Sequence, residues 1–339
     1  MAIQTEFYGP YAAYLLQNGP LRARVTAYGA TLLSLWAPDR QGREVDVLLG
    51  FDTPEAQHAY SDYQGETVGR CANRIAGARF SLNGQEYHVT ANEKGTTCLH
   101  GGGEFSHAVW DAEIQGDNAV EFRCISPAGS EGFPGEVRAA ARYVLEPGRL
   151  RMEYRAESDT DTILNLTNHA YFNLAGGGDV LRHELQINAA AYLPIDEQSI
   201  PTGERRPVAG TAFDFRRAKP IGRDIRAEDP QLAQCRGYDH NFCLTESDRF
   251  DLTVPAAAVS EPGSGRRLTV YTDQPGIQLY TGNFLDGKPG KGGVPMEQHS
   301  GFCLETQVWP DSPNHPDFPS CLLMAGEVYQ RTTILQLDA

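Results

Sequence analysis

The chain has 339 residues, of which 40% are hydrophobic and 22% are charged, a composition typical of a globular protein with a sizeable core. It carries 29 basic and 44 acidic residues, which gives a net charge of 29 − 44 = −15. Nucleic acids and anionic membranes bind basic surfaces, so this charge argues against both as partners.

Apolar residues alternate with polar ones along much of the chain, beginning with residues 21–27, and this is the period of a β-strand. Asn83-Gly84 separates two alternating segments, which is the strongest short-range signal for a β-hairpin. A second hairpin is predicted over residues 143–154, with its turn at Pro147-Gly148.

Long helical periodicity is scarce. Residues 221–234 are a weak helical candidate that Pro230 interrupts. Many short strands, few helices and frequent glycine and proline turns predict an all-β sandwich or barrel, which we expect to form a single domain over residues 1–339.

Residues 162–174 (TILNLTNHAYFNL) predict an unbroken strand with one apolar face and one polar face. The polar face would carry Asn165, Thr167, His169, Tyr171 and Asn173. Two later segments alternate in the same way. Their polar faces would carry Gln278 and Tyr280 in residues 276–284, and Cys303, Glu305, Gln307 and Trp309 in residues 301–310.

The solvated outer face of an antiparallel sheet is the common interpretation of such alternation. Here, however, the polar faces carry mainly amides and aromatic rings, and they carry no lysine. Amides bind hydroxyl groups and ring faces cover apolar C–H patches, so these strands favour a sugar site.

Three loops have the same character, although each taken singly is more often structural. They contain Arg70, Asn73 and Arg74 in residues 69–80, His100 before three glycines in residues 98–105, and Asp239 in residues 237–242. The glycines are expected to let the backbone approach a ligand closely.

Seven segments, in this order, resemble the galactose mutarotase (aldose 1-epimerase) family. They are VGRCANRIAGARF (68–80), LHGG (99–102), SEGFPGEV (130–137), LTNHAYFNL (166–174), GYDHNF (237–242), GIQLYTGNFL (276–285) and LETQVWPDSPNHPDFPS (304–320). The resemblance implies a large antiparallel β-sandwich with few short helices and a sugar site on the concave face of a sheet.

The resemblance also implies a role for eight residues. His169 would be the catalytic acid and Glu305 the catalytic base. The substrate-binding positions that carry over are Asn73, Arg74, His100, Tyr171, Asp239 and Gln278.

The chemistry suits these groups, because mutarotation of a free aldohexose needs one acid and one base that flank the anomeric carbon, and no cofactor or metal. A carboxylate is ready as a base at pH 7, and a histidine can donate a proton if a neighbour stabilises its charge. Asp239 is expected to raise the pKa of His169 or His100 in this way. The residues alone leave the acid and base roles of His169 and Glu305 interchangeable.

Four rival functions share some of these residues. His100, His169, Asp239 and Glu305 could form a metal site, and Asp239 with Glu305 could serve a glycoside hydrolase. A non-catalytic sugar-binding module and an epimerase of sugar phosphates, using Arg70 and Arg74, are the other two.

The seven cysteines are odd in number, and no pair has CxxC spacing, so we expect buried reduced thiols in a cytoplasmic protein. The N-terminal residues predict neither a signal peptide nor a membrane span. We expect a monomer or homodimer whose partner is a small-molecule sugar.

Overall fold

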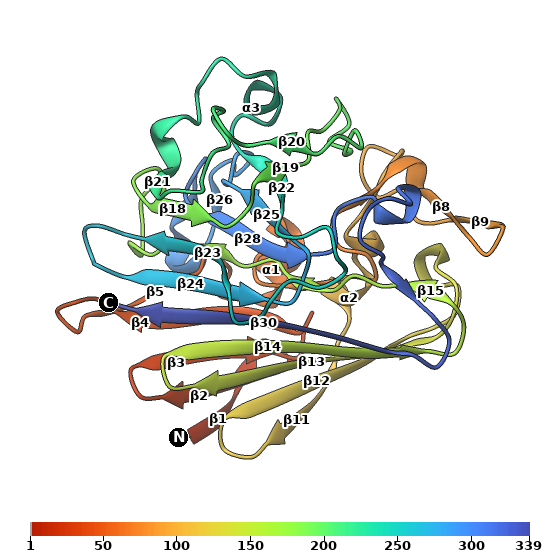
Figure 1. Ribbon diagram of the computed structural model, residues 1–339. Coiled ribbons are helices and arrows are strands. Elements are labelled where there is room, and N and C mark those ends of the chain that lie inside the picture. Colours follow the sequence, from red (N-terminus) through yellow and green to blue (C-terminus); the bar gives the residue numbers. More distant parts are fainter. Residues whose placement is uncertain (1) are drawn as a thin grey trace.

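A computed structural model describes residues 2–339 of the chain, and its ribbon is dominated by antiparallel strands (Figure 1). Strands account for 44% of the residues and short helices for 11%, so the predicted all-β fold is confirmed. None of the helices in the described residues is long and apolar enough to cross a membrane.

Two large sheets meet in the lower half of the molecule in Figure 1, and the larger one continues upward to β18 and β21. One has five strands in sequence order: β1 (Ala2–Tyr8), β2 (Tyr11–Asn18), β3 (Leu21–Thr26), β4 (Thr31–Pro38) and β5 (Glu44–Asp46). The other has nine strands in the spatial order β11 (Asp111–Gln115), β12 (Ala119–Ser126), β13 (Val137–Glu146), β14 (Arg149–Ser158), β30 (Val328–Asp338), β24 (Arg267–Thr272), β23 (Pro255–Ser260), β18 (Glu184–Ile187) and β21 (Lys219–Pro220).

A six-stranded sheet lies above them. Its strands, in spatial order, are β17 (Tyr171–Phe172), β28 (Phe302–Gln307), β25 (Gly276–Tyr280), β22 (Asp239–Cys243), β19 (Ala191–Tyr192) and β20 (Arg206–Pro207). The remaining strands pair two by two: β6 (Thr67–Val68) with β16 (Thr167–Asn168), β7 (Arg74–Ile75) with β10 (Cys98–Leu99), β8 (Arg79–Leu82) with β9 (Gln85–His88), β15 (Thr162–Ile163) with β29 (Leu322–Leu323), and β26 (Lys288–Pro289) with β27 (Pro295–Met296).

The three large sheets share one hydrophobic core. The rings of Tyr14 in β2 and Phe122 in β12 meet between the five-stranded and nine-stranded sheets, because alternate residues of each strand point inward. Leu279 and Leu304 extend the same cluster from the six-stranded sheet. Their strand neighbours, which point to the opposite face, are therefore free to build a site.

Both predicted hairpins are confirmed. β8 and β9 meet at Asn83-Gly84, where both residues have the positive φ that a tight hairpin turn requires. β13 and β14 pair over ten residues and turn at Pro147-Gly148.

The single strand predicted over residues 162–174 is wrong. β15, β16 and β17 pair with three different partners, and the side chains between them are buried on both sides. The amide of Asn165 binds the backbone N–H and carbonyl of Val308, and that of Asn173 binds the Ala175 N–H and the Ser300 carbonyl. These side-chain bonds replace the ladder of a continuous strand.

The helical candidate at residues 221–234 is corrected as well. It contains the 3-10 turn η4 (Ile221–Arg223) and the helix α3 (Pro230–Cys235), which begins at Pro230 instead of being interrupted there. Asp229 caps α3 through the Gln231 N–H, and proline suits the first turn because it lacks an N–H to satisfy. The other helices are α1 (Pro54–Tyr60), α2 (Glu104–His107) and the 3-10 turns η1 (Ala76–Ala78), η2 (His100–Gly103), η3 (Ser130–Gly132), η5 (Lys291–Gly293) and η6 (Ser312–Asn314).

Candidate active site

The pairing of β7 with β10 brings three of the predicted site residues together. Arg74 stands opposite Leu99, and one residue further along, the His100 N–H donates to the Asn73 carbonyl at 2.9 Å. The Asn73 N–H in turn donates to Nδ1 of His100 at 3.2 Å. Both Asn73 and His100 have positive φ, so the chain turns sharply at each of them and directs the side chains to one side.

The glycines after His100 have a different use from the one expected. A Cβ atom on Gly101 would overlap the backbone of Gly69 and Arg70, and one on Gly102 would overlap the side chain of Glu131. The glycine run therefore packs against the protein's own chain and not against a ligand, and it fixes His100 beside the 69–74 segment.

Three further site residues come from adjacent strands of the six-stranded sheet. Gln278 of β25 lies directly opposite Glu305 of β28. On its other side, Asp239 of β22 is two residues from Asn241, which is the residue opposite Gln278. Nε2 of Gln278 donates to Oδ1 of Asp239 at 2.7 Å. The alternation that predicted polar faces on these strands is confirmed here.

His169 and Tyr171 lie where the chain passes from β16 to β17. Nε2 of His169 is 3.5 Å from Oε2 of Glu305, and Nδ1 is 3.7 Å from the Cys303 sulfur. The Tyr171 ring stacks on the His169 ring with 5.2 Å between centroids. The Tyr171 hydroxyl donates to the Asp62 carbonyl at 3.0 Å, so its ring face is what it offers a ligand.

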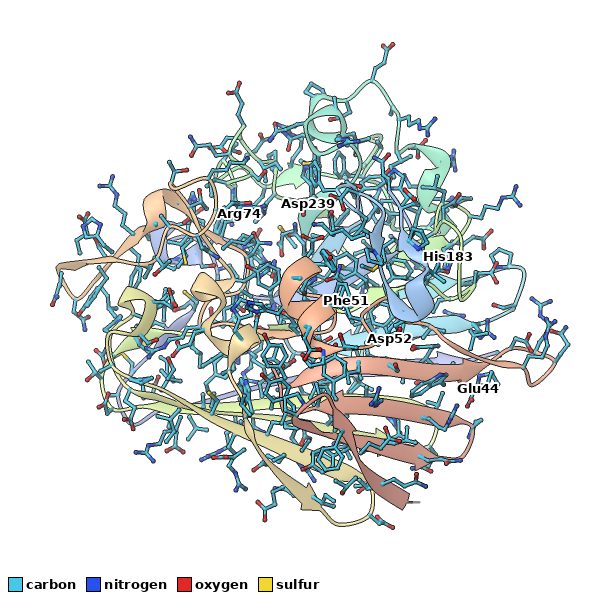
Figure 2. All side chains as sticks on the ribbon, turned by 180° about the vertical axis from the view of Figure 1, so that it is seen from behind. Glu44, Phe51, Asp52, Arg74, His183 and Asp239 are labelled. Carbon is cyan, nitrogen blue, oxygen red and sulfur yellow. The ribbon has the colours of Figure 1, made fainter. Side chains whose placement is uncertain are left out.

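These side chains line one cavity of about 470 Å³. Its walls are Asp62, Tyr63, Asn73, Arg74, Glu93, Lys94, Leu99, His100, His169, Tyr171, Glu197, Ser199, Gln234, Cys235, Asp239, Tyr280, Phe284 and Glu305. Seven of the eight predicted residues are among them, and Figure 2 shows Arg74 and Asp239 side by side at this place. Gln278 lies behind Asp239, in a small adjoining space.

Arg74 is the less exposed of the two basic residues in the cavity wall, the other being Lys94, and it is held by Glu93. Nε and Nη2 of Arg74 donate to the two carboxylate oxygens of Glu93, each at 2.8 Å, in a planar bidentate pair. Burial raises the pKa of Asp239, while the charge of Arg74 and the hydrogen bond from Gln278 act to lower it.

Burial dominates the protonation of the facing pair. It raises the pKa of Glu305 to about 8, with Asp239 adding to the rise and Arg74 opposing it. It lowers the pKa of His169 to about 4, and Arg74 lowers it further. At pH values between about 4 and about 8, Glu305 and His169 therefore share one titratable proton, as an acid and base pair must. Oε2 of Glu305 has no hydrogen-bond partner among the described residues, which leaves it free for a ligand.

The expectation that Asp239 raises the pKa of a histidine is wrong. Burial also lowers the pKa of His100 well below its usual value, with His169 and Arg74 adding to the effect. His100 is therefore neutral at pH 7, and because its Nδ1 accepts the Asn73 N–H, its proton is on Nε2.

That proton decides whether the cluster suits a metal. The possible ligand atoms of His100, His169 and Glu305 lie within 4.8 Å of one another, without Asp239. A metal needs a lone pair on Nε2 of His100, but the bond to Asn73 places a hydrogen there. His100 is thus arranged to donate a hydrogen bond to a ligand oxygen, and the fit to a metal is poor.

Sequence reasoning gave no site role to Tyr63, Glu93 or Phe284. Tyr63 packs on His100 and His169, Glu93 holds Arg74, and Phe284 lines the cavity. Tyr280, which alternation placed on the polar face with Gln278, is a wall residue as well, whereas Trp309 is buried against Phe318. Tyr63 and Glu93 lie in loops, where no period indicates their position.

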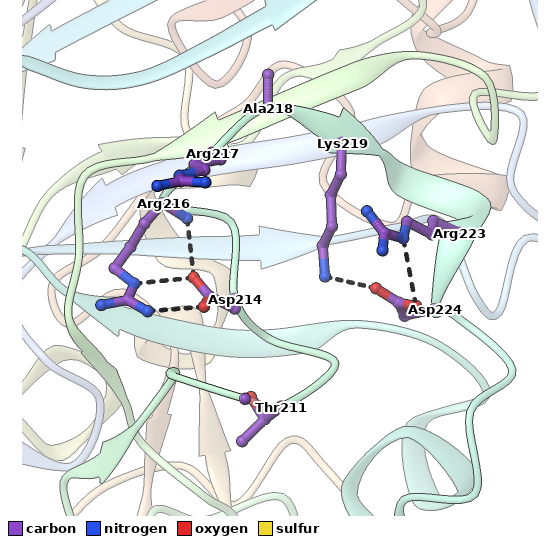
Figure 3. Close-up of a pocket in the computed structure, with 9 residues that line it drawn as sticks. Thr211, Asp214, Arg216, Arg217, Ala218, Lys219, Arg223 and Asp224 are labelled. Carbon is purple, nitrogen blue, oxygen red and sulfur yellow. Dashed lines mark hydrogen bonds and ion pairs between the residues drawn. The ribbon is translucent and has the colours of Figure 1, made fainter.

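Arg70 is not part of the cavity. Its guanidinium donates to the Ser126 hydroxyl and to the carbonyls of Ser126, Pro127, Pro134 and Gly135, so it clamps a loop. A second hollow, at the edge formed by β21, contains four basic side chains (Figure 3). Arg216 binds Asp214 in a bidentate pair and Lys219 binds Asp224, so most of its charge is already compensated.

Comparison with known proteins agrees with this geometry. A family described as aldose 1-epimerase matches residues 12–336. The galactose mutarotase of Bos taurus is 47% identical over 96% of this chain and 93% of its own length, and the aldose 1-epimerase of Escherichia coli K12 is 40% identical over 97% and 96%. The crystal structure of an aldose epimerase homologue from C. elegans superimposes with a TM-score of 0.88, at 30% identity, over 99% of both chains.

Proposed function

This chain belongs to the aldose 1-epimerase family, and from that membership we propose that its cavity binds a free aldohexose such as galactose or glucose and interconverts the α and β anomers. The observation that carries the assignment of the site is the facing pair His169 and Glu305, 3.5 Å apart in a buried polar cavity. Both oxygens of a hemiacetal are bonded to the same carbon, so a neighbouring acid and base can reach them together.

In the proposed reaction Glu305 takes the proton of the C1 hydroxyl while His169 gives a proton to the ring oxygen. The bond between C1 and the ring oxygen breaks, and the open aldehyde rotates about C1–C2. Closure runs the same steps in reverse on the other face: His169 recovers a proton from the chain hydroxyl and Glu305 returns one to the C1 oxygen. No proton is gained or lost over the cycle, and no cofactor is required.

In the empty cavity burial favours the neutral pair, with the shared proton on Glu305. The reaction as written starts with that proton on His169. We propose that the sugar causes the transfer, because its C1 hydroxyl donates to the Glu305 carboxylate and its ring oxygen accepts from the protonated His169. Arg74 favours the same change, since its charge stabilises an ionised Glu305.

The remaining positions would hold the sugar. Asn73, Arg74, Asp239 and Nε2–H of His100 present donors and acceptors to hydroxyl groups, and the Tyr171 ring presents an apolar face. Gln278 would contribute through its bond to Asp239. The rival phosphate clamp loses support, because Arg70 is bound to backbone carbonyls and Arg74 to Glu93.

Several broader points belong to the same proposal. A single domain over residues 1–339 is supported by the main core cluster, which draws residues from Tyr14 to Leu337. We also propose that the protein is a monomer or a homodimer. A cytoplasmic location is supported by the seven cysteines, all free and six of them buried.

The test is polarimetry of freshly dissolved α-galactose with the purified protein. We expect a fast approach to anomeric equilibrium, lost in Glu305→Gln and in His169→Asn, which keep size and polarity but remove the proton-transfer groups. Rates near those of the unmodified protein in either variant would refute the role of that residue. Release of reducing sugar from an aryl glycoside would instead support the hydrolase.

A further inference from the structure

The wall that Tyr63 forms against both histidines is held in a strained conformation. Its ring centroid lies 4.5 Å from that of His100 and 5.9 Å from that of His169. Its φ is +68°, a left-handed conformation that bulky side chains rarely adopt and that persists only where neighbouring contacts enforce it. The residues that enforce it therefore act on the site without touching the sugar.

Those contacts lead to Glu66, a carboxyl that the proposed reaction does not use. Ser61 Oγ lies 2.6 Å from Oε1 of Glu66, and Gln57 Nε2 donates to the same oxygen at 3.0 Å. Ser61 Oγ also lies 3.1 Å from Oε1 of Gln64, which accepts the Asp62 N–H at 2.7 Å. The chain of contacts from Glu66 through Ser61 to Gln64 thus encloses Asp62 and Tyr63.

The backbone of Glu66 reaches the catalytic pair directly. Its carbonyl accepts the His169 N–H at 2.9 Å, and the neighbouring Gly65 N–H donates to the His169 carbonyl at 3.0 Å. A change at Glu66 can therefore reach His169 along the backbone and Tyr63 through the loop.

Counting hydrogens shows which form of Glu66 closes this chain. Ser61 has one hydroxyl hydrogen and two acceptors, so both contacts form only when Glu66 carries a proton and donates to Ser61, which then donates to Gln64. The carboxyl is also almost fully buried, which disfavours its ionised form. The titratable groups around it are Tyr8, Tyr28, Tyr63 and Asp62, and none of them supplies a positive charge.

We propose that Glu66 is a positioning residue, which fastens the Ser61–Gln64 loop and thereby holds Tyr63 against His100 and His169 for sugar binding. The inference rests on the proposed function of the cavity. It has a consequence near neutral pH, because burial raises the pKa of Glu66 to about 7. Ionisation breaks the link to Gln64, so the sugar should bind more weakly as the pH rises through 7.

The experiment follows galactose between pH 6 and pH 8.5 in the unmodified protein and in Glu66→Gln, measuring KM and kcat by polarimetry and Kd by calorimetry. The amide still donates to Ser61 but cannot ionise. We expect the ratio of KM in the unmodified protein to KM in Glu66→Gln to rise about fivefold across this range. The corresponding ratio of kcat values should change less than twofold. Asp39→Asn, another buried carboxyl that does not line the cavity, is the matched control and should give a constant ratio.

A constant ratio for Glu66→Gln would overturn the inference. Ser61→Ala breaks the same link without altering the carboxyl, and it should raise KM about fivefold at pH 6 without changing the pH at which kcat falls. In Tyr63→Leu the further change Glu66→Gln should have no effect, because the wall that Glu66 holds is gone. Additive effects of the two changes would also contradict the inference.

Failure of the proposed function looks different. If the protein shows no mutarotation, but the Kd for galactose rises with pH in the unmodified protein and not in Glu66→Gln, then the reaction is rejected and the positioning role of Glu66 is kept. If mutarotation occurs and the Kd has the same pH dependence in both proteins, then the reaction is kept and the positioning role of Glu66 is rejected.

Discussion

Nε2 of His169 and Oε2 of Glu305 lie 3.5 Å apart, in a cavity where both side chains are almost fully removed from water. Glu305 belongs to β28, whereas His169 lies at the junction of β16 and β17, 136 residues earlier in the sequence. Burial pushes their pKa values in opposite directions and leaves one proton for the pair over a wide pH range.

The rate of mutarotation should therefore follow a bell-shaped curve against pH. Below about pH 4 His169 becomes protonated while Glu305 is also protonated, so no base remains. Above about pH 8 the pair loses its only proton, so no acid remains. The measurement is kcat/KM by polarimetry from pH 3.5 to 9.5, and a rate that rises steadily beyond pH 9 would contradict it.

The stability of Glu305→Gln should exceed that of the unmodified protein at neutral pH. Folding raises the pKa of Glu305 from 4.5 to about 8, so its stabilising contribution is complete below pH 4.5 and is lost as the pH rises through 8. The glutamine has no such loss, so the difference in free energy of unfolding should grow from pH 4.5 to 8 and reach roughly 1–3 kcal/mol. Urea unfolding at both pH values measures it. Glu184→Gln, on an exposed part of β18, should show no growing difference.

Removal of the Arg74 charge should move the whole pH curve. Arg74 lowers the pKa of both Glu305 and His169, so in Arg74→Gln both values rise and both limbs of the curve shift to higher pH. KM should also rise roughly tenfold or more, because a buried charged hydrogen bond is worth about 1.5–3 kcal/mol. Arg217→Gln, in the second hollow, is the control and should leave curve and KM in place. A shift of only one limb would mean that Arg74 acts on only one of the two groups.

Gly101→Ala should destabilise the fold and reduce activity together. The added methyl overlaps the Gly69–Arg70 backbone, and the residue has a φ of +67°, so the strand end that carries His100 must move. We expect a loss of about 2–4 kcal/mol in the free energy of unfolding, as for other forced backbone displacements. Gly84→Ala has a similar positive φ but open space around it, so it should lose only about 1 kcal/mol and no activity.

Strand periodicity predicted those parts of the site that lie within a regular sheet. Gln278 and Glu305 point the same way because their strands pair in register, and their parity could be read directly from the sequence. Strand periodicity failed at residues 162–174, because the side-chain amides of Asn165 and Asn173 bind backbone groups and break the strand. No local pattern distinguishes an asparagine that ends a strand from one that faces solvent.

The loop residues could be placed only through resemblance or not at all. Asn73, Arg74 and His100 carry no period, and their convergence depends on the pairing of β7 with β10. Tyr63, Glu66 and Glu93 belonged to none of the matching segments, and their positions follow from side-chain contacts that no sequence period indicates. The assignment of burial, and hence the direction of each pKa shift, needed the three-dimensional structure as well.

The junction at which His169 sits has a consequence for how the protein assembles. β16, just before it, belongs with β6, whereas β17, just after it, joins the six-stranded sheet beside β28. Pairing of β17 with β28 places Tyr171 opposite Cys303 and so brings His169 beside Glu305, whereas pairing of β16 with β6 does not. Recovery of mutarotation during refolding therefore times the pairing of β17 with β28, separately from the formation of the other strands.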